Sequence, residues 1–288
     1  MKGVIIAAGY GTRFLPTTKT IPKEMLPIID IPTIEFTVRE FVDSGITDIL
    51  IVSSRRKKAI EDYFDREIEL ETVFAEEKAT EKLAKLKASE ELARFHFLRQ
   101  QEMRGTAHAI LLAQSFVGNE PFVVAYPDDF FVGTPPVTKQ LVNAYENSKK
   151  NVLSAFEVPQ SEVSRYGILT PGKTLPELPQ VFEVQGLVEK PKAETAPSNF
   201  AALGRYLFLP EIFPLFEKTV NQMKTGEAFQ TDAIHELATK GRVVATTISG
   251  ERFDTGTPLG YLKTLVRFAL ARSDLREEFQ VFLRELQL

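Results

Sequence analysis

The chain opens with an apolar segment followed by glycines and basic residues, a combination suited to binding phosphate. Residues 4–6, Val-Ile-Ile, form a continuous apolar run, as expected for a strand buried on both faces. Gly9 and Gly11 allow the backbone after this strand to turn tightly and to approach a ligand. Arg13 and Lys23 add two positive charges nearby. The segment therefore predicts a phosphate-binding loop at the end of a buried strand.

Two other glycine motifs fit the sequence poorly. The dinucleotide-binding motif needs a third glycine, and Phe14 stands in its place. Residues 167–174 have the form of the P-loop of NTPases, but a P-loop opens a helix. Pro176 and Pro179 follow it and do not start one, so we expect a surface turn there.

Polar side chains follow two later strands. Gln100 comes after a predicted strand at 95–98, and Asp128 and Asp129 come after one at 121–125. In an open parallel sheet, ligands bind at the carboxyl ends of the strands. We therefore expect these side chains to share one site with the glycine loop.

The first half of the chain alternates apolar strands with amphipathic helices. This pattern predicts an α/β fold, a Rossmann-like and mostly parallel mixed sheet flanked by helices. Further strands are expected at 48–53 and 151–158, and helices at 32–44, 55–65, 105–116 and 136–149. The segment 67–94, dense in Glu and Lys, is expected to form one or two solvated helices.

The pattern changes after residue 158. Short β segments at 164–208 predict a smaller, β-rich layer closing over a second substrate, followed by helices near 210–218 and 230–240 and a strand at 242–248. No linker separates independent domains, so we expect one domain, 1–288, with a nucleotide-binding part (1–158), a sugar-phosphate-binding part (159–256) and C-terminal helices (257–288). The last helix carries an apolar stripe for internal packing or for a homo-oligomer contact, formed by Phe279, Phe282, Leu283 and Leu286.

Composition narrows the classes of function. The chain has 288 residues, 43% of them hydrophobic, which is enough for a large core. A net charge of -4 argues against a nucleic acid as partner. The absence of cysteine excludes disulfides, thiolate catalysis and cysteine-ligated metals. No leader and no membrane-spanning run stand out, so we expect a cytoplasmic enzyme.

Two blocks of sequence carry a family resemblance. Residues 9–13, Gly-Tyr-Gly-Thr-Arg, followed by 22–27, Pro-Lys-Glu-Met-Leu-Pro, resemble the signature of sugar-nucleotide nucleotidyltransferases. Residues 15–19 and the Glu-Met pair make the chain look most like the bacterial UTP:glucose-1-phosphate uridylyltransferases of that family. The resemblance continues through 189–191, 197–199 and 204–206, and so covers nearly the whole chain.

The resemblance implies a Mg²⁺-dependent reaction of UTP with glucose 1-phosphate that gives UDP-glucose and pyrophosphate. It implies that Arg13 holds the triphosphate, that Lys23 acts on the α-phosphoryl group, and that Asp128 and Asp254 bind the magnesium ion. Carboxylates are suitable ligands for this ion. Thr255 departs mildly from the family pattern but leaves Asp254 in place.

The same resemblance assigns the substrate contacts. The nucleotide is expected to contact Ala8, Gly9, Gly11, Thr12, Glu24, Gln100 and Gly105, with the amide of Gln100 reading the base. The sugar phosphate is expected to contact Asp129, Gly167, Glu189 and Lys190. His108 is expected to be structural, since the three histidines of the chain lie far apart and show no zinc spacing.

Other functions stay open on sequence alone. The same chemistry with dTTP or another sugar phosphate is an alternative, because the residues that distinguish a hydroxyl or methyl group cannot be placed from the sequence. A non-catalytic paralogue that binds a nucleotide sugar is a further alternative, and a glycosyltransferase is disfavoured because Asp128-Asp129-Phe130 lacks the Asp-x-Asp pattern. The family also implies a homodimer or homotetramer.

Overall fold

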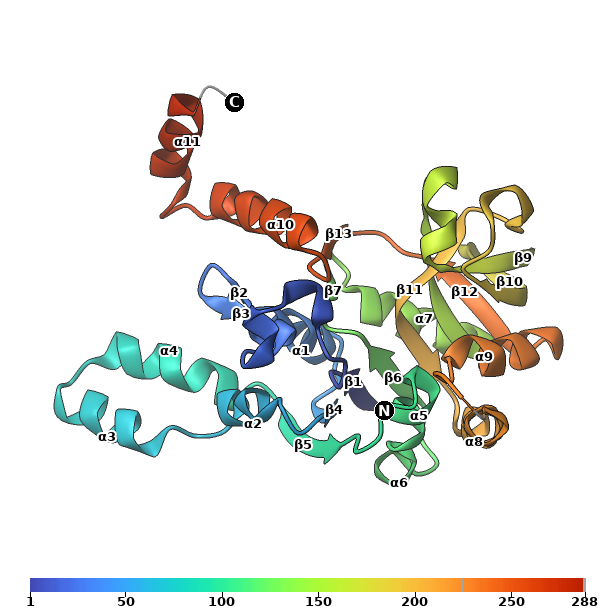
Figure 1. Ribbon diagram of the computed structural model, residues 1–288, viewed down its shortest axis with the longest axis horizontal. Coiled ribbons are helices and arrows are strands. Elements are labelled where there is room, and N and C mark those ends of the chain that lie inside the picture. Colours follow the sequence, from blue (N-terminus) through green and yellow to red (C-terminus); the bar gives the residue numbers. More distant parts are fainter. Residues whose placement is uncertain (224, 287–288) are drawn as a thin grey trace.

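The structure is a computed structural model that describes residues 1–223 and 225–286. Its centre is one nine-stranded mixed sheet (Figure 1). The strands are β1 (Lys2–Ile6), β4 (Asp48–Ser53), β5 (Arg94–Arg99), β6 (Phe122–Ala125), β8 (Asn151–Glu157), β9 (Gly167–Leu175), β10 (Leu178–Glu189), β11 (Phe200–Phe208) and β12 (Val243–Thr247). They are ordered β5-β4-β1-β6-β11-β8-β12-β10-β9.

Most strands of this sheet run in one direction. β1 pairs in parallel with β4 and β6, β4 with β5, and β8 with β12. β11 and β10 run against their neighbours. The prediction of a mixed α/β sheet flanked by helices is therefore confirmed, but parallel pairing joins only β5, β4, β1 and β6 and, separately, β8 and β12.

The β-rich segment differs from its prediction. β9, β10 and β11 do not form a separate layer, because they join the central sheet, and β11 lies between β6 and β8. The P-loop-like string at 167–174 lies in β9, which continues through a hairpin into β10. The expected surface turn is thus wrong, although no helix follows the string, as predicted.

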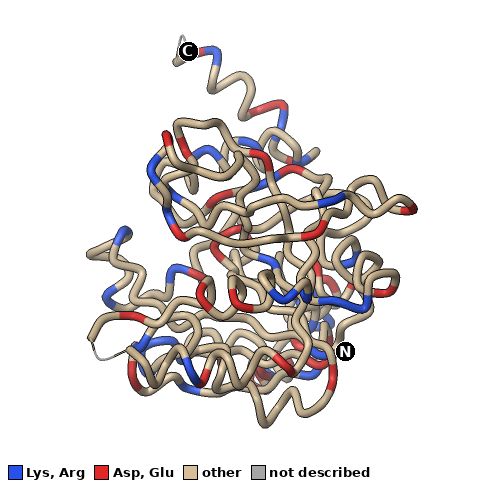
Figure 2. The backbone as a smooth tube through the Cα atoms, turned by 90° about the vertical axis from the view of Figure 1, so that its right-hand side faces the viewer, with Lys and Arg blue, Asp and Glu red and all other residues tan. Residues whose placement is uncertain are grey.

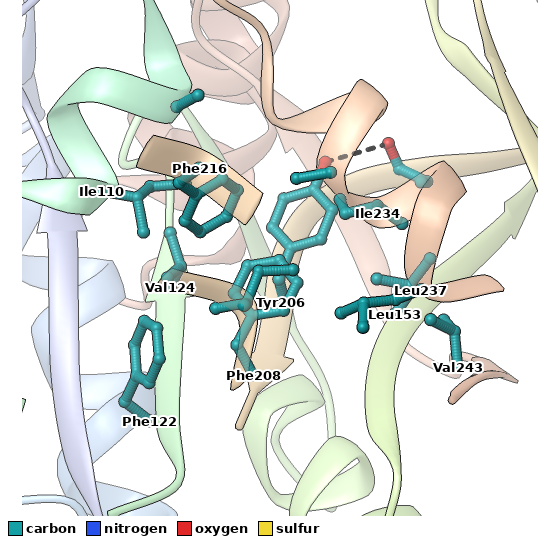
Figure 3. Packing of buried hydrophobic residues seen from close by; sticks show 14 of the residues in the cluster. Ile110, Phe122, Val124, Leu153, Tyr206, Phe208, Phe216, Ile234, Leu237 and Val243 are labelled. Atoms are coloured by element: carbon teal, nitrogen blue, oxygen red, sulfur yellow. Dashed lines mark hydrogen bonds between the residues drawn. The ribbon is translucent and has the colours of Figure 1, made fainter. Parts of the chain in front are cut away.

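Helices cover both faces of the sheet. On one face lie α1 (Thr33–Asp43), α2 (Lys58–Phe64) and α7 (Val137–Ser148), and on the other α5 (Thr106–Leu111), α8 (Phe213–Gln222) and α9 (Gln230–Thr239). Alternate residues of β1 enter the two cores, Val4 and Ile6 on the α5 side and Ile5 on the α1 side. Figure 3 shows the α5 side, where Phe216 and Ile234 pack near Phe208. The apolar run of β1 therefore serves two cores.

Two helical segments extend from this body (Figure 1). One is the charged hairpin of α3 (Ile68–Glu76) and α4 (Thr80–Glu90), which confirms the expected solvated helices. The other is α10 (Pro258–Ala271) with α11 (Arg276–Glu285). No residue of α11 is buried, and Phe282 is 50% exposed. The stripe of α11 is thus only partly covered by its own chain, because Phe279 and Leu283 are half-buried and Phe282 and Leu286 are exposed.

Short elements complete the fold. The predicted helix at 105–116 is split into α5 and α6 (Gln114–Val117). Two-stranded sheets pair β2 (Pro27–Ile28) with β3 (Ile31–Pro32), and β7 (Asp129–Val132) with β13 (Glu251–Asp254). The 3-10 helices are η1 (Thr12–Phe14), η2 (Thr17–Lys19), η3 (Lys23–Met25), η4 (Gln160–Arg165), η5 (Ala193–Thr195) and η6 (Pro210–Ile212).

Charged residues are distributed along the backbone with both signs interspersed (Figure 2). Within residues 1–223 and 225–286, none of the helices combines the length and the apolar character that a membrane span requires.

Candidate functional site

The glycine loop follows β1 at the carboxyl end of the parallel strands. Gly11 has a left-handed backbone with φ 68°, which favours glycine, and its carbonyl accepts a hydrogen bond from Thr18 Oγ1 at 2.8 Å. Ala8 is buried, whereas Gly9 and Thr12 are exposed. The loop therefore has a fixed conformation and an accessible surface.

Arg13 extends from this loop to the other half of the chain. Its Nη1 donates to the carbonyl of Gly256 at 3.2 Å. Both residues line a cavity of about 440 Å³, which we call the central cavity. The guanidinium thus faces this cavity.

Asp128 and Asp254 meet at Gly256 through the pairing of two short strands. Asp254 of β13 lies opposite Asp129 of β7, which places Asp254 next to Asp128. Thr255 anchors the turn by donating to the Asp128 carbonyl from its backbone nitrogen at 2.9 Å and from Oγ1 at 3.0 Å. A Cβ atom on Gly256 would lie 3.1 Å from Asp128 Oδ2 and 3.2 Å from Asp254 Oδ1. The two carboxylates therefore both lie beside Gly256, whose backbone nitrogen donates to Asp254 Oδ1 at 2.9 Å.

This donor set fits a hard divalent cation. Two carboxylates with phosphate oxygens and waters match the preference of Mg²⁺. No cluster of three or more His, Cys, Asp or Glu suited to a metal occurs in the described part of the chain. The remaining ligands would thus have to come from substrate and solvent.

Lys23 contacts the same carboxylate. Its ammonium donates to Asp128 Oδ2 in a partly buried ion pair. Burial acts to raise the pKa of Asp128, but the ammonium outweighs it and holds that pKa below its usual value. Burial likewise acts to lower the pKa of Lys23, but Asp128 and Glu24 together raise it. Both groups are therefore charged at neutral pH.

Glu24 is placed differently from the prediction. It is 1% exposed, and both its carboxylate oxygens accept from Lys57 Nζ at 2.7 Å. Lys57 is also buried. This geometry argues against the expected direct contact of Glu24 with the nucleoside, because its oxygens face another side chain and not a cavity.

Asp129 lines the central cavity but is already paired. Arg252 binds it in a bidentate manner, with Nε 2.8 Å from Oδ1 and Nη2 2.9 Å from Oδ2. Arg252 also donates to the hydroxyl of Tyr166 at 3.3 Å. The sequence analysis missed Arg252, which gave no local signal.

Arg205 holds the backbone around these aspartates. It is fully buried, pairs with both oxygens of Glu40, and donates from Nη1 to the carbonyls of Tyr126 and Asp129 at 3.1 and 3.0 Å. This residue was also missed, although an arginine inside the apolar strand β11 is a signal that sequence analysis can use.

Gln100 follows β5 and is 4% exposed. Its Nε2 donates to the Gly105 carbonyl at 3.2 Å and lies 3.1 Å from His108 Nδ1. Gly105 has φ 97°, and a Cβ there would lie 2.4 Å from the carbonyl oxygen of Ala228, so only glycine fits. Burial lowers the pKa of His108, and Arg104 acts in the same direction.

A second cavity, of about 370 Å³, lies at the carboxyl ends of β4 and β5, and we call it the β4–β5 cavity. Gln100 lines it together with Tyr10, Ser54, Arg55, Arg56, Arg99, Gln101 and Met103.

The predicted sugar-phosphate residues lie in the central cavity. Gly167 and Glu189 are opposite each other in the β9–β10 pair, and a Cβ on Gly167 would lie 3.3 Å from Glu189 Oε2. Lys190 has φ 44°, an unusual value for a residue other than glycine, and its Nζ lies 3.6 Å from Glu189 Oε1. The backbone carbonyl of Tyr166 accepts a hydrogen bond from the Lys190 backbone nitrogen at 3.0 Å.

The structure thus brings most of the predicted residues together. Seven line the central cavity, namely Arg13, Asp128, Asp129, Gly167, Glu189, Lys190 and Asp254. Lys23 joins them through Asp128, while Gln100 and Gly105 contact each other beside the β4–β5 cavity.

Comparisons with known proteins match this chain over nearly its whole length. Residues 2–269 match a family model described as nucleotidyl transferase. A Staphylococcus saprophyticus protein named UTP–glucose-1-phosphate uridylyltransferase 2 is 44% identical, over 100% of this chain and 98% of that protein. A UTP-bound UGPase from Acinetobacter baumannii is 37% identical, with a TM-score of 0.89 and 99% of both chains covered. A UDP-glucose pyrophosphorylase complexed with UDP-glucose is 37% identical, with a TM-score of 0.83, over 94% of this chain and 99% of that one.

Proposed function

The chain belongs to the nucleotidyl transferase family, and we propose that it transfers the uridylyl group of UTP to glucose 1-phosphate, forming UDP-glucose and pyrophosphate. The observation that carries this proposal is the meeting of Arg13, Asp128 and Asp254 at one end of a cavity that also holds Glu189 and Lys190. Relatives that match over their whole length and carry this activity in their names support the choice of substrates.

For this reaction the protein must align the two substrates and compensate the negative charge of their phosphates. A phosphate oxygen of glucose 1-phosphate attacks the α-phosphorus of UTP in line, and the bond to the pyrophosphate oxygen breaks. The nucleophile is already an anion, so no general base is required. Arg13 holds the triphosphate with its planar guanidinium, and Lys23 moves its ammonium from Asp128 to the α-phosphoryl group.

Asp128 and Asp254 would hold Mg²⁺, because both place carboxylate oxygens beside Gly256. When bound, the ion supplies compensation for the negative charge of the phosphoryl oxygens. Thr255 contributes by fixing the backbone of this turn against Asp128.

Glu189 accepts from sugar hydroxyls, and Lys190 holds the 1-phosphate, with Gly167 leaving room for the hexose. Asp129 accepts a hydrogen bond from a sugar hydroxyl. Its oxygens retain lone pairs for this contact while Arg252 fixes their direction.

The nucleotide lies over the glycine loop. Its phosphates contact the backbone of Gly9, Gly11 and Thr12, and its base reaches Ala8, Gly105 and Gln100. Glu24 is held by Lys57 and neither residue lines the central or the β4–β5 cavity, so we assign Glu24 no direct contact with the nucleotide.

The exposed stripe on α11 supports a homodimer or homotetramer, since Phe282 and Leu286 are each 50% exposed. A cytoplasmic location suits a reaction that consumes UTP.

Pyrophosphate release from purified protein with Mg²⁺, glucose 1-phosphate and a panel of triphosphates tests the function. We expect UTP to be preferred. A tenfold preference for dTTP would show that the uridylyl assignment is wrong, and a better substrate among other hexose phosphates would correct the sugar. No pyrophosphate release with any pair would favour a binding protein.

Lys23→Ala tests the mechanism. We expect turnover to fall by about a hundredfold or more with a smaller change in the KM for UTP, because the ammonium acts on charge that develops in the transition state. Lys85→Ala, which removes an exposed lysine of α4 that lines neither cavity, is the control and should leave both constants unchanged. A weaker KM with unchanged turnover would contradict this role.

A further inference from the structure

We infer that His108 is a specificity-determining residue, because it fixes the amide of Gln100 in the orientation that selects a pyrimidine with a hydrogen on N3. This inference rests on the proposed function, in which Gln100 faces the base. It adds a role for a side chain that sequence analysis treats as structural.

The contacts of Gln100 define the orientation of its amide. The NH2 group carries two hydrogens, and two acceptors face it, the Gly105 carbonyl at 3.2 Å and His108 Nδ1 at 3.1 Å. Among the described residues, no hydrogen bond is directed to Gln100 Oε1. The amide therefore presents a carbonyl oxygen to the β4–β5 cavity, which Gln100 lines.

His108 decides how firmly this orientation is held. The Gly105 carbonyl only accepts, but an imidazole nitrogen either accepts or donates. A neutral His108 with its proton on Nε2 offers a lone pair at Nδ1, so a flipped amide would set its oxygen against two acceptors. If Nδ1 carried the proton and donated instead, either orientation of the Gln100 amide would form a hydrogen bond with one of these two neighbours and place like groups against the other.

The orientation has a direct consequence for the base. Uracil and thymine carry N3–H, which donates to Gln100 Oε1. Cytosine has a lone pair on N3, which would face that oxygen and leave a buried acceptor without a donor. The arrangement therefore favours UTP and dTTP over CTP and does not separate UTP from dTTP.

Two variants test the inference. His108→Leu removes the acceptor, whereas His108→Asn keeps one, because the Asn amide oxygen takes the place of Nδ1. Dissociation constants for UTP, dTTP and CTP with Mg²⁺ are measured by calorimetry, together with kcat and KM for each. His108→Met replaces the leucine variant if the latter does not fold.

We expect the wild type to bind UTP at least about tenfold more tightly than CTP. His108→Leu should lower this ratio by about fivefold, because one neutral hydrogen bond contributes a binding free energy of that size. The variant should change KM more than kcat. The ratio of dTTP to UTP should not change, since both bases carry N3–H. His108→Asn should retain the wild-type ratios.

An unchanged UTP to CTP ratio in the folded leucine or methionine variant overturns the inference. Equal weakening of all three nucleotides does so too, because it indicates a structural role alone. The inference is also overturned if His108→Asn, which keeps the acceptor, loses as much selectivity as His108→Leu. Failure of the proposed function is a separate result, seen as absent UDP-glucose synthesis in the wild type, and the dissociation constants still test the amide in that case.

Discussion

Replacing Arg205 with methionine should destabilise the protein and slow the reaction, although Arg205 is not part of the cavity surface. Methionine fills a similar volume but cannot donate hydrogen bonds. The change leaves the buried Glu40 carboxylate without its cation and removes the donors to the carbonyls of Tyr126 and Asp129.

The expected loss of stability in Arg205→Met follows from the contacts between Arg205 and Glu40. Removing one partner of a buried ion pair costs about 3–5 kcal/mol, mostly from the unpaired charge that remains. Among the described residues, Glu40 then keeps the side-chain hydrogen bonds from Thr138 alone, at 3.0 Å from its backbone nitrogen and 2.6 Å from its hydroxyl. Because folded proteins are stable by roughly 5–15 kcal/mol, we expect a large shift of the unfolding midpoint.

Denaturant unfolding at 25 °C measures this free energy, and a double variant isolates its cause. Glu40→Gln in the Arg205→Met background removes the unpaired charge, so the double variant should recover about 2 kcal/mol or more. Turnover of the folded Arg205→Met protein should fall by about a hundredfold, since the carbonyls of Tyr126 and Asp129 on either side of Asp128 lose the hydrogen bonds that position them.

Two results would refute this reasoning. One is a loss of stability below about 1 kcal/mol for Arg205→Met. The other is a double variant whose destabilisation equals the sum of the two single changes, because independent contributions would mean that the ion pair is not the source.

Three further changes have definite expected outcomes. Lys190→Ala should raise the KM for glucose 1-phosphate by about tenfold to a hundredfold, because a hydrogen bond from a charged group contributes a binding free energy of that size. An unchanged KM in steady-state assays would contradict the role assigned to Lys190. Gly105→Ala should cost at least about 2 kcal/mol in denaturant unfolding, because its Cβ would lie 2.4 Å from a backbone oxygen, whereas Gly118→Ala, with positive φ but open space, should cost less. Burial lowers the pKa of His108 in the folded protein, so as the pH falls this histidine is protonated first in the unfolded chain. The free energy of unfolding is therefore at its full value above about pH 6.5 and declines below it. His108→Asn should flatten that decline in unfolding curves from pH 7 to 5, and an unchanged slope would assign the decline to other groups.

The sequence alone determined the local features of the site. The apolar run of β1 and the glycines after it predict a buried strand with a ligand-binding turn, because both features depend on neighbouring residues only. The amphipathic helices followed from periodicity for the same reason, and the solvated helices of 67–94 followed from the density of Glu and Lys. The order of strand ends also indicated that Gln100 and Asp128 belong to one edge of the sheet, as the structure shows.

The tertiary structure alone decided which charged groups pair with one another. Asp254 approaches Asp128 only because β13 pairs with β7, and the hydrogen bond that fixes this turn spans 127 positions of the chain. The pairing of Arg252 with Asp129 and of Lys57 with Glu24 likewise depends on which strands and turns become neighbours. Short-range patterns report a residue's own backbone conformation and burial, whereas the partner of a buried charge is set by strand order across the whole sheet, which no local pattern records.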